Sequence, residues 1–172
     1  MSPSDLLQFA SDYPIGTVLR DYVDPDSGLR LLILRGPFSF CAYVGAHADH
    51  AMAGLDELEF DCHCGITFQE WGQAGTPWEE NWFWWGWDYA HFMNAIPWEE
   101  SLPEDATPEQ RRVMALISEQ LNAVDFLGQR PKQKTLGQVV EDTLDVMMEL
   151  KEALVQSEKF ASLAMFKQNK PA

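Results

Sequence analysis

The sequence has few cysteines, no long apolar run and no basic N-terminal segment. Its three cysteines among 172 residues are too few for a disulfide framework, and an odd number is typical of a reducing compartment. No apolar run reaches about 18 residues, so we expect no transmembrane helix. The first residues lack the positive charge and the apolar core of a secretory signal. We therefore expect a cytoplasmic protein that does not associate with membranes.

Basic residues are scarce where acidic residues are dense. The first hundred residues contain 16 acidic side chains and three arginines, and the first lysine is Lys132. The whole chain carries a formal net charge of −15, and because such a surface repels phosphate, we do not expect direct binding to nucleic acid. This charge favours solubility. It would also attract a basic protein, or imitate nucleic acid toward a protein that binds it.

Apolar segments separated by turn residues predict strands in the first hundred residues. Residues 24–28, Asp-Pro-Asp-Ser-Gly, favour a turn because proline presets φ and glycine accepts a left-handed backbone. The apolar runs around this turn and after it have the length and composition of strands. The expected strands span residues 17–23, 29–34, 38–44, 55–68 and 82–87.

Two capping boxes predict helices in the remainder of the chain. Thr107-Pro-Glu-Gln110 and Thr135-Leu-Gly-Gln138 each place a hydroxyl and an amide three residues apart at a helix start. Strands followed by helices favour an α+β fold, with an antiparallel sheet of about five strands in the N-terminal two thirds covered by C-terminal helices. We expect a single domain. Residues 1–104 would form a short helix and the sheet, and residues 105–172 a helical hairpin on the same core.

Each expected helix has an apolar stripe at three- and four-residue spacing. The first stripe consists of Val113, Leu116, Ile117 and Leu121, and the second of Leu136, Val140, Leu144, Met147 and Leu154. Such stripes are most often core faces, and we interpret them in this way. A hairpin that forms a homodimer is the alternative.

Tryptophan is concentrated in one segment. Six of the seven tryptophans lie between Trp78 and Trp98. A strand over residues 82–87 would carry large aromatic side chains on both faces, with Trp84 and Trp85 pointing in opposite directions. Such a strand is either part of a packed aromatic core or the wall of a cleft for a ligand or partner.

A histidine–aspartate set is the strongest candidate for catalysis. Asp88 and His91 are three residues apart, so a helix would place them on one face and let the carboxylate orient the imidazole. With His63 they would form a set able to act as general acid and base or to bind a metal ion. The alternative is a buried histidine beside an aspartate that caps a helix. The sequence shows no nucleophile motif and no phosphate-binding glycine loop.

His47, His50, Cys62 and Cys64 are weak candidates for zinc ligands. Zinc prefers thiolate and imidazole, and a strand over residues 55–68 would put both cysteines on one face. However, one residue between the cysteines departs from the spacing of about two to four residues that is usual in zinc motifs. We therefore expect two cysteines that act as small apolar residues, and no cofactor.

Gly65 and Thr67 are candidates for ligand binding. A glycine within a strand indicates a bulge or the close approach of another backbone, and Thr67 adds a hydroxyl beside it. A ligand edge passing here would use backbone groups, and an ordinary β-bulge is the alternative. The expected ligand-binding cleft consists of His63, Gly65, Thr67, Trp84, Trp85, Asp88 and His91.

Three segments together resemble a family of small proteins encoded by phages, prophages and their bacterial hosts. The segments are Tyr43-Val-Gly45 followed by His47 or His50, then Cys62-His63-Cys64-Gly65-Ile66-Thr67-Phe68, then Trp84-Trp85-Gly86-Trp87-Asp88-Tyr89-Ala90-His91. In that family the second motif commonly reads His-Gly-Gly-(Leu/Ile)-Thr-(Tyr/Phe), and the third Trp-Trp-x-Gly-Phe-Asp-x-Ala-His. This chain departs from the pattern at Cys64, where glycine is usual, and at Trp87, where phenylalanine is usual.

The resemblance covers roughly residues 40–95 and implies a context rather than a chemistry, because the family has no settled activity. It implies an accessory protein of a phage or mobile element in the bacterial cytoplasm. It points to His63, Thr67, Asp88 and His91 as motif positions. Since glycine is usual at the position of Cys64, the resemblance weakens the zinc hypothesis.

Two classes of function remain open. The first, which we favour, is a binding protein whose cleft holds a small nucleotide-like ligand or grips a basic host protein, such as a defence protein. The second is a small hydrolase-like enzyme in which a metal ion, or His63, Asp88 and His91, supply acid–base chemistry. The sequence offers a fragment of a catalytic set rather than a complete one, which favours binding.

Overall fold

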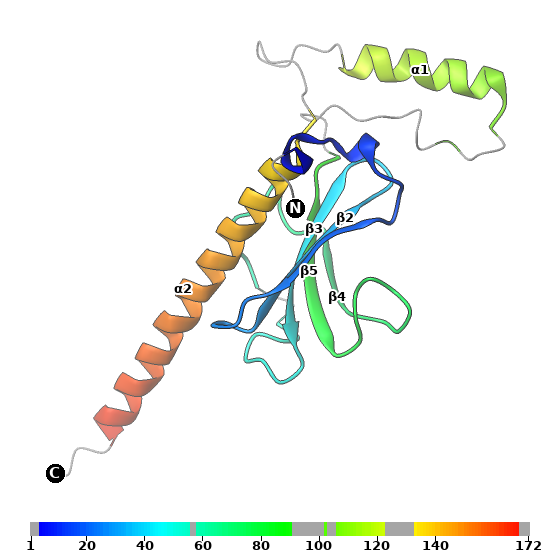
Figure 1. The fold of residues 1–172 in the computed structure, drawn as a ribbon. Helices are drawn as coiled ribbons and strands as arrows, with labels where there is room; N and C mark the ends of the chain where they lie inside the picture. The colour runs from blue at the N-terminus through cyan, green and yellow to red at the C-terminus, as the bar shows by residue number, and fades with distance from the viewer. Residues whose placement is uncertain (1–3, 56–57, 91–101, 103–105, 123–132, 169–172) are drawn as a thin grey trace.

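The structure, a computed structural model, describes residues 4–55, 58–90, 102, 106–122 and 133–168. Five strands form the sheet: β1 (Val18–Val23), β2 (Leu29–Arg35), β3 (Phe40–His47), β4 (Phe68–Trp71) and β5 (Trp82–Asp88). Two short 3₁₀ helices, η1 (Asp5–Leu7) and η2 (Ala10–Asp12), precede the sheet, and two α-helices, α1 (Pro108–Asn122) and α2 (Leu136–Gln168), follow it. The expected α+β fold is confirmed (Figure 1).

The sheet has the strand order β1-β2-β3-β5-β4, and every neighbouring pair is antiparallel. The first three strands form the expected meander. The turn between β1 and β2 has the expected chemistry, because Gly28 has a φ of 74° and its N–H donates to the Asp24 carbonyl at 2.8 Å. β1 and β4 are the edge strands, so β2, β3 and β5 lie in the interior of the sheet.

The expected strand over residues 55–68 is wrong. Its end, from Phe68, belongs to β4, and the described residues before it form coil and turns. The backbone gives the reason: Cys64 and Gly65 have φ of 59° and 89°, in the left-handed region that a strand does not contain. Apolar side chains of this coil, such as Leu58, still pack against the core. The alternating pattern therefore reflects burial of a coil rather than a strand.

α2 covers one face of the sheet (Figure 1). The residues of α2 that are buried there are Leu136, Val139, Thr143, Val146, Met147 and Leu150. Thr143 is tolerated in this core because its hydroxyl donates to the Val139 carbonyl at 2.6 Å, which leaves no unsatisfied donor. The expected stripe is therefore right at Leu136 and Met147, which are buried, and at Val140 and Leu154, which are partly buried against the core, whereas Leu144 is exposed.

Residues 72–81 cover part of the opposite face. From this segment, Trp78 contacts the rings of Phe68 and Tyr43, with centroid distances of 5.4 Å and 5.5 Å. The strands leave room for these rings through glycine, since a Cβ on Gly86 would lie 2.3 Å from the Tyr43 ring. Aromatic side chains thus lie directly on the backbone of β5.

Arg30 closes the rim of this second face. Its guanidinium carbon lies 5.1 Å from the Trp82 ring centroid and 5.6 Å from that of Trp84, which are cation–π distances. The same guanidinium pairs with Asp21 at 2.7 Å and with Glu79 of the covering segment. This arginine therefore joins an edge strand, the aromatic strand β5 and the loop that covers it.

The described apolar residues of the α1 stripe are exposed. Val113, Leu116 and Ile117 are all exposed, whereas the sequence predicts a core face, and the side chain of Leu121 lies outside the described residues. The helical hairpin on a shared core, and the homodimer alternative, stay predictions. Within the described part of the chain, no helix is both long and apolar enough to cross a bilayer.

Candidate functional site

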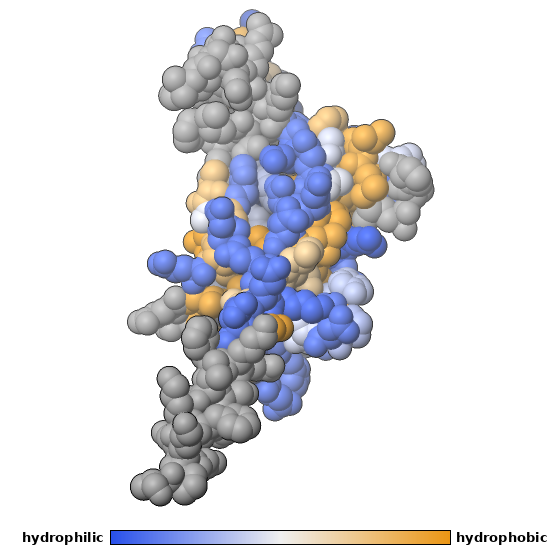
Figure 2. Space-filling view, turned by 90° about the vertical axis from the view of Figure 1, so that its left-hand side faces the viewer, coloured by the Kyte–Doolittle hydropathy of each residue, from blue (hydrophilic) through white to orange (hydrophobic). Residues whose placement is uncertain are grey.

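An open groove of about 400 Å³ lies between α2 and the coil that precedes β4. Its lining residues are Asp61, Cys62, His63, Lys134, Asp142, Asp145, Val146 and Glu149. Figure 2, which shows the side of the molecule on which α2 lies, has a band of hydrophilic residues along the middle of this face. The groove thus runs along a polar flank of the helix that packs on the sheet.

A tight turn shapes one wall of the groove. The Gly65 N–H donates to the Cys62 carbonyl at 3.1 Å, and the left-handed backbone of Cys64 and Gly65 reverses the chain. His63, at the second position of the turn, stacks on Tyr89, with ring centroids 4.6 Å apart and planes inclined by 19°. The turn is therefore anchored to the residue that follows β5.

The buried Tyr89 lies beneath the turn and supports the ring of His63. The indole N–H of Trp87 donates to its hydroxyl at 3.2 Å. Burial raises the pKa of the Tyr89 hydroxyl, and the neighbouring Asp142 carboxylate raises it further. Tyr89 is consequently neutral at physiological pH and serves as a rigid platform for His63.

The other wall is acidic. Asp142, Asp145 and Glu149 come from one side of α2, and Asp61 faces them from the coil. Lys134 lies 3.4 Å from the Asp142 carboxylate. Within the described part of the chain, the carboxylates of Asp61, Asp145 and Glu149 have no cationic partner. The groove therefore presents an uncompensated negative field to solvent.

Cys62 is the thiol on the groove wall. Burial raises its pKa to about 11, and the neighbouring Asp61, Cys64 and Glu149 raise it as well, although a hydrogen bond from the Gly65 N–H opposes them. The side chain is therefore a protonated thiol at neutral pH. A thiol in this state is a poor metal ligand, and it reacts mainly with a sulfur that is already oxidised.

The structure does not bring the catalytic candidates His63 and Asp88 together. β5 alternates, so Trp87 and Tyr89 point toward α2 and His63, whereas Asp88 points to the opposite face. There Asp88 raises the pKa of Cys41, next to the larger effect of burial, and its carboxylate accepts a hydrogen bond from the Ala90 N–H at 2.8 Å. The third candidate, His91, lies outside the described residues.

The aromatic strand is a packed core. Trp84 and Trp85 are fully buried, one on each face of the sheet, and the Trp85 indole N–H donates to the Leu55 carbonyl at 3.0 Å. No ligand can reach either ring without opening the core. Of the two interpretations of residues 82–87, the structure has the core, so the expected aromatic cleft is not formed by these tryptophans.

Gly65 and Thr67 lie on the exposed side of the coil. The Thr67 N–H is used by the sheet, since it donates to the Gly86 carbonyl at 2.8 Å. Gly65 has the positive φ that the turn requires. Both residues therefore have structural reasons for their positions, and a contact with a ligand stays a prediction for them.

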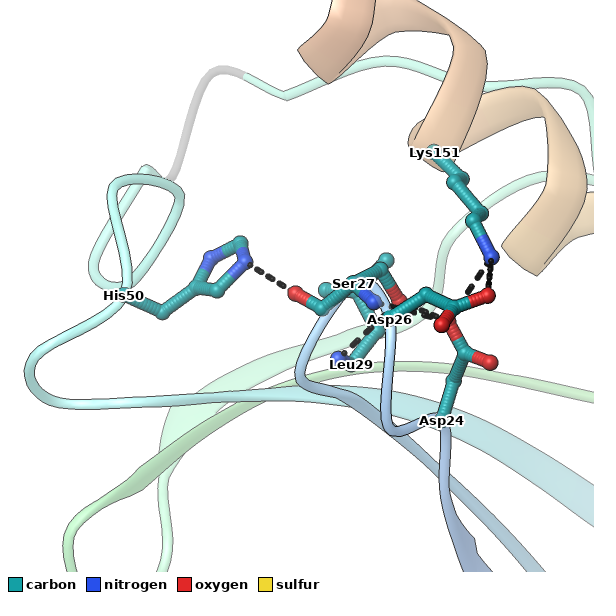
Figure 3. Close-up of polar contacts among 6 residues, drawn as sticks. All are labelled: Asp24, Asp26, Ser27, Leu29, His50 and Lys151. Carbon is teal, nitrogen blue, oxygen red and sulfur yellow. Dashed lines mark hydrogen bonds and ion pairs between the residues drawn. The ribbon is translucent and has the colours of Figure 1, made fainter.

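The four weak zinc candidates are separated into different contacts. His50 accepts a hydrogen bond from the Met52 N–H at Nδ1, which leaves Nε2 protonated to donate to the Ser27 carbonyl at 3.0 Å (Figure 3). His47 has its Nδ1 atom 3.3 Å from the Asp49 carboxylate. In the part of the chain that the structure describes, no three His, Cys, Asp or Glu side chains are placed to hold a metal ion. Zinc binding through Cys62 and Cys64 was expected from a shared strand face, and that face does not form.

A polar network fixes the position of α2, which carries the acidic wall. Lys151 donates to Asp24 at 3.3 Å and to Asp26 at 2.9 Å, both in the turn between β1 and β2 (Figure 3). The N–H and hydroxyl of Ser27 donate to Asp24 at 2.9 Å and 2.6 Å, and these bonds lower the pKa of the Asp24 carboxyl. The turn therefore links α2 to the sheet beside the core.

Most residues of the groove are not among the candidates that the sequence predicts. Asp142, Asp145 and Glu149 follow a spacing of three and then four residues, which places carboxylates on one side of a helix. That signal was available. What was missing was the position of the Asp61–His63 coil opposite them, because those residues were assigned to a strand.

The groove combines side chains from a coil and a helix that lie far apart in the chain. Its chemistry suits a cationic group, since three carboxylates face solvent without a partner cation within the described residues.

No protein-family model matches the chain, and searches of curated proteins and of solved structures find no similar protein.

Proposed function

We propose that this protein is a binding protein whose acidic groove, defined by Asp61, His63, Asp142, Asp145 and Glu149, holds a basic segment of a protein partner. The observation that carries the proposal is that the carboxylates of Asp61, Asp145 and Glu149, in an open groove, have no cationic partner among the residues that the structure describes. In the phage context that the sequence motifs imply, the partner would be a basic host protein, including a defence protein.

The charge of the groove selects the class of ligand. Counting the four carboxylates and Lys134 gives a formal charge of −3 with His63 neutral. A lysine or arginine side chain entering the groove would relieve repulsion among these carboxylates and form charge-assisted hydrogen bonds. The net charge of −15 on the whole chain would add steering of a basic partner from a distance.

The same charge disfavours a nucleotide-like ligand, the other occupant expected from the sequence. Phosphate oxygens would meet the carboxylates of Asp145 and Glu149, and Lys134, the basic residue of the lining, is already paired with Asp142. A nucleotide base could not stack on Trp84 or Trp85, because both rings are buried. A basic protein segment is therefore the better-supported ligand.

For the hydrolase-like alternative, His63 is the catalytic candidate that lines the groove. It is the imidazole that lines the groove, and its neighbours there are carboxylates of α2 rather than Asp88. A role in catalysis would require His63 as general acid or base with one of those carboxylates. The binding proposal requires only that His63 remain stacked on Tyr89.

A titration with fluorescein-labelled octa-arginine tests the proposal. Asp145→Asn with Glu149→Gln removes two groove charges. Glu141→Gln with Glu152→Gln removes two exposed charges from the same helix outside the groove. We expect the groove pair to weaken binding about 5- to 30-fold, from about 0.5–1 kcal/mol for each exposed ion pair lost, and the control pair to weaken it about twofold or less. Fluorescence anisotropy at fixed ionic strength measures all three proteins.

Equal losses in the two double variants would contradict the proposal, because the peptide would then sense net charge rather than the groove. Failure of the wild-type protein to bind octa-arginine at low salt would contradict it as well. His63→Gln should retain binding within about threefold, whereas a hydrolase would lose its activity in this variant without losing its fold.

A further inference from the structure

The turn of Cys62, His63, Cys64 and Gly65 places two thiols on either side of the groove histidine. The turn is closed by the 3.1 Å hydrogen bond from Gly65 to the Cys62 carbonyl. Cys64 is exposed and Cys62 is half-buried. In a turn, the Cα atoms of residues two apart lie about 5–6 Å from each other, because successive Cα atoms are about 3.8 Å apart. Disulfides form at Cα separations of about 4.4–6.8 Å.

We propose that Cys62 and Cys64 are an oxidation site that forms a reversible disulfide within this turn, and that the disulfide moves His63 off Tyr89. The exposed Cys64 would react first, because oxidants reach it from solvent. Cys62 would then act as the resolving thiol from the groove wall. Cys41, the third cysteine, lies on β3 and pairs in register with Asp88, on the opposite side of the sheet from this turn.

The reaction balances with hydrogen peroxide as the two-electron oxidant. The Cys64 thiolate attacks the peroxide O–O bond, which breaks to give a sulfenic acid on Cys64 and hydroxide that takes up a proton. The sulfur of Cys62 then attacks the Cys64 sulfur, forms the S–S bond, and releases its own proton and a hydroxide as water. Overall two thiols and one peroxide give one disulfide and two waters. A dithiol reductant reverses the step, because its own thiols are oxidised to a disulfide.

The bond would change the groove because the Cys62 sulfur must leave its present contact. Cys62 lines the groove, and its sulfur accepts a hydrogen bond from the Gly65 N–H. A ring closed through both sulfurs has to redirect the backbone of His63, which lies between them. The stack of His63 on Tyr89, at 4.6 Å and 19°, depends on that backbone. The effect on ligand binding rests on the proposed function, whereas formation of the bond does not.

Counting thiols tests the first half of the proposal, that Cys62 and Cys64 form a disulfide. The reduced full-length protein is treated with hydrogen peroxide, the excess is removed, and the remaining thiols are alkylated under denaturing conditions for intact-protein mass spectrometry. We expect the number of alkylated thiols to fall from three to one, with a monomeric mass lower by two hydrogen atoms before alkylation. Cys41→Ser should still lose both remaining thiols. Cys64→Ser, at an exposed position, should form no intramolecular disulfide.

Two results would overturn this half. One is a product that joins two chains. The other is a chain oxidised to sulfinic acid with Cys62 still free. Dithiothreitol should restore all three thiols, and a product that resists it contradicts a reversible site.

NMR of the histidine side chains tests the second half, that the disulfide moves His63 off Tyr89. Ring protons of His63 should be shifted by the ring current of Tyr89 in the reduced protein, and His63→Asn identifies them among the four histidines. We expect peroxide to move these signals toward ordinary values in the wild type and to leave them in place in Cys64→Ser. A disulfide that forms without moving them would contradict the coupling to the groove. Octa-arginine binding to the reduced protein tests the proposed function separately, since it does not require the bond.

Discussion

The two faces of the sheet are covered by different kinds of structure. On one face, Trp78 of the segment over residues 72–81 lies against Tyr43 and Phe68, and Arg30 closes the rim. On the other face, α2 packs an apolar side on the sheet and leaves a polar side next to a coil. The loop over residues 72–81 lays one ring, Trp78, on aromatic side chains of the strands and covers part of its face. α2, which has one polar flank, leaves a groove beside it, and ionisable residues line that groove.

This difference separates the residues that stabilise the protein from those we propose for recognition. Trp84, Trp85 and Trp87 of β5 are buried, with at least one on each face of the sheet, so they contribute to stability. Asp145 and Glu149 of α2 face solvent next to the turn at His63, and the repulsion between their carboxylates lowers stability rather than adding to it. Variants of the first kind should therefore change the free energy of unfolding, and variants of the second kind should change binding.

The largest effect should come from the buried tryptophans. Trp84→Ala and Trp85→Ala each remove a fully buried side chain, and we expect each to lower the free energy of unfolding by about 3–5 kcal/mol. Trp71→Ala, at a side chain that is 47% exposed, should cost about 1 kcal/mol or less. Urea unfolding followed by circular dichroism compares the variants. If the alanine variants do not fold, Trp84→Phe should cost about 1–3 kcal/mol. A loss at Trp84 no larger than at Trp71 contradicts a packed core.

A second prediction concerns the glycine that lets an aromatic ring lie on β5. In Gly86→Ala the new Cβ would lie 2.3 Å and 2.5 Å from atoms of the Tyr43 ring, so we expect a loss of about 2–3 kcal/mol. The matched control is Gly16→Ala, which meets nothing within 4 Å but has a φ of 84°, and should cost about 1 kcal/mol. Adding Tyr43→Leu to Gly86→Ala should recover part of the loss. Additive costs in that double variant would show that the ring and the glycine are not coupled.

A third prediction concerns Arg30, which binds the covering segment to the sheet. Arg30→Met removes the contacts with Trp82 and Trp84 and the ion pairs with Asp21 and Glu79, and should cost about 1–2 kcal/mol. Arg30→Lys should recover less than half of that, because an ammonium lacks the planar fork of a guanidinium. Arg20→Met, at an exposed arginine of the neighbouring strand β1, is the control and should change stability little. If Arg30→Lys kept the full stability of the wild type, the charge of the side chain alone, and not its planar shape, would explain the effect.

The smallest effect is a pH dependence on the helix-covered face. Hydrogen bonds from Ser27 lower the pKa of Asp24 in the folded protein. A carboxyl with a lowered folded pKa contributes stability that is fully present above its unfolded pKa of about 3.9. That stability is lost as the pH falls through the folded pKa. Between about pH 5 and pH 2 the wild type should therefore lose more stability than Asp24→Asn. Parallel losses in the two proteins, measured by urea unfolding across this range, would contradict the role of Asp24.

The fold was largely predictable from local patterns. Strands β2, β3 and β5 coincide with apolar runs bounded by turn residues, and the turn at Gly28 was predictable because its φ of 74° suits glycine. The segment over residues 55–68 was not predictable from alternation. Leu58 alternates with polar neighbours as a strand residue would, but it lies in a coil and is partly buried against the core. The left-handed backbone at Cys64 gave no signal, since cysteine rarely adopts it.

The site was less predictable than the fold. His63 was singled out by its motif and does line the groove. A short helix was expected to pair Asp88 with His91, and His63 was added to this set from another element. β5 instead continues through Asp88, so the Asp88 side chain points to the face of the sheet opposite His63. The acidic wall of α2 requires knowledge of which coil packs beside it. That information lies in the tertiary arrangement rather than in any local pattern.

The most direct test of the central claim is a ¹H–¹⁵N NMR titration of the reduced wild-type protein with octa-arginine. We expect the largest shift changes at residues 61–65 and 142–149, on the two walls of the groove, with smaller changes at β1 and residues 72–81. The same titration of Asp145→Asn with Glu149→Gln should abolish most of these changes. Shift changes centred on residues 72–88, or spread evenly over the acidic surface, would contradict the groove as the binding site.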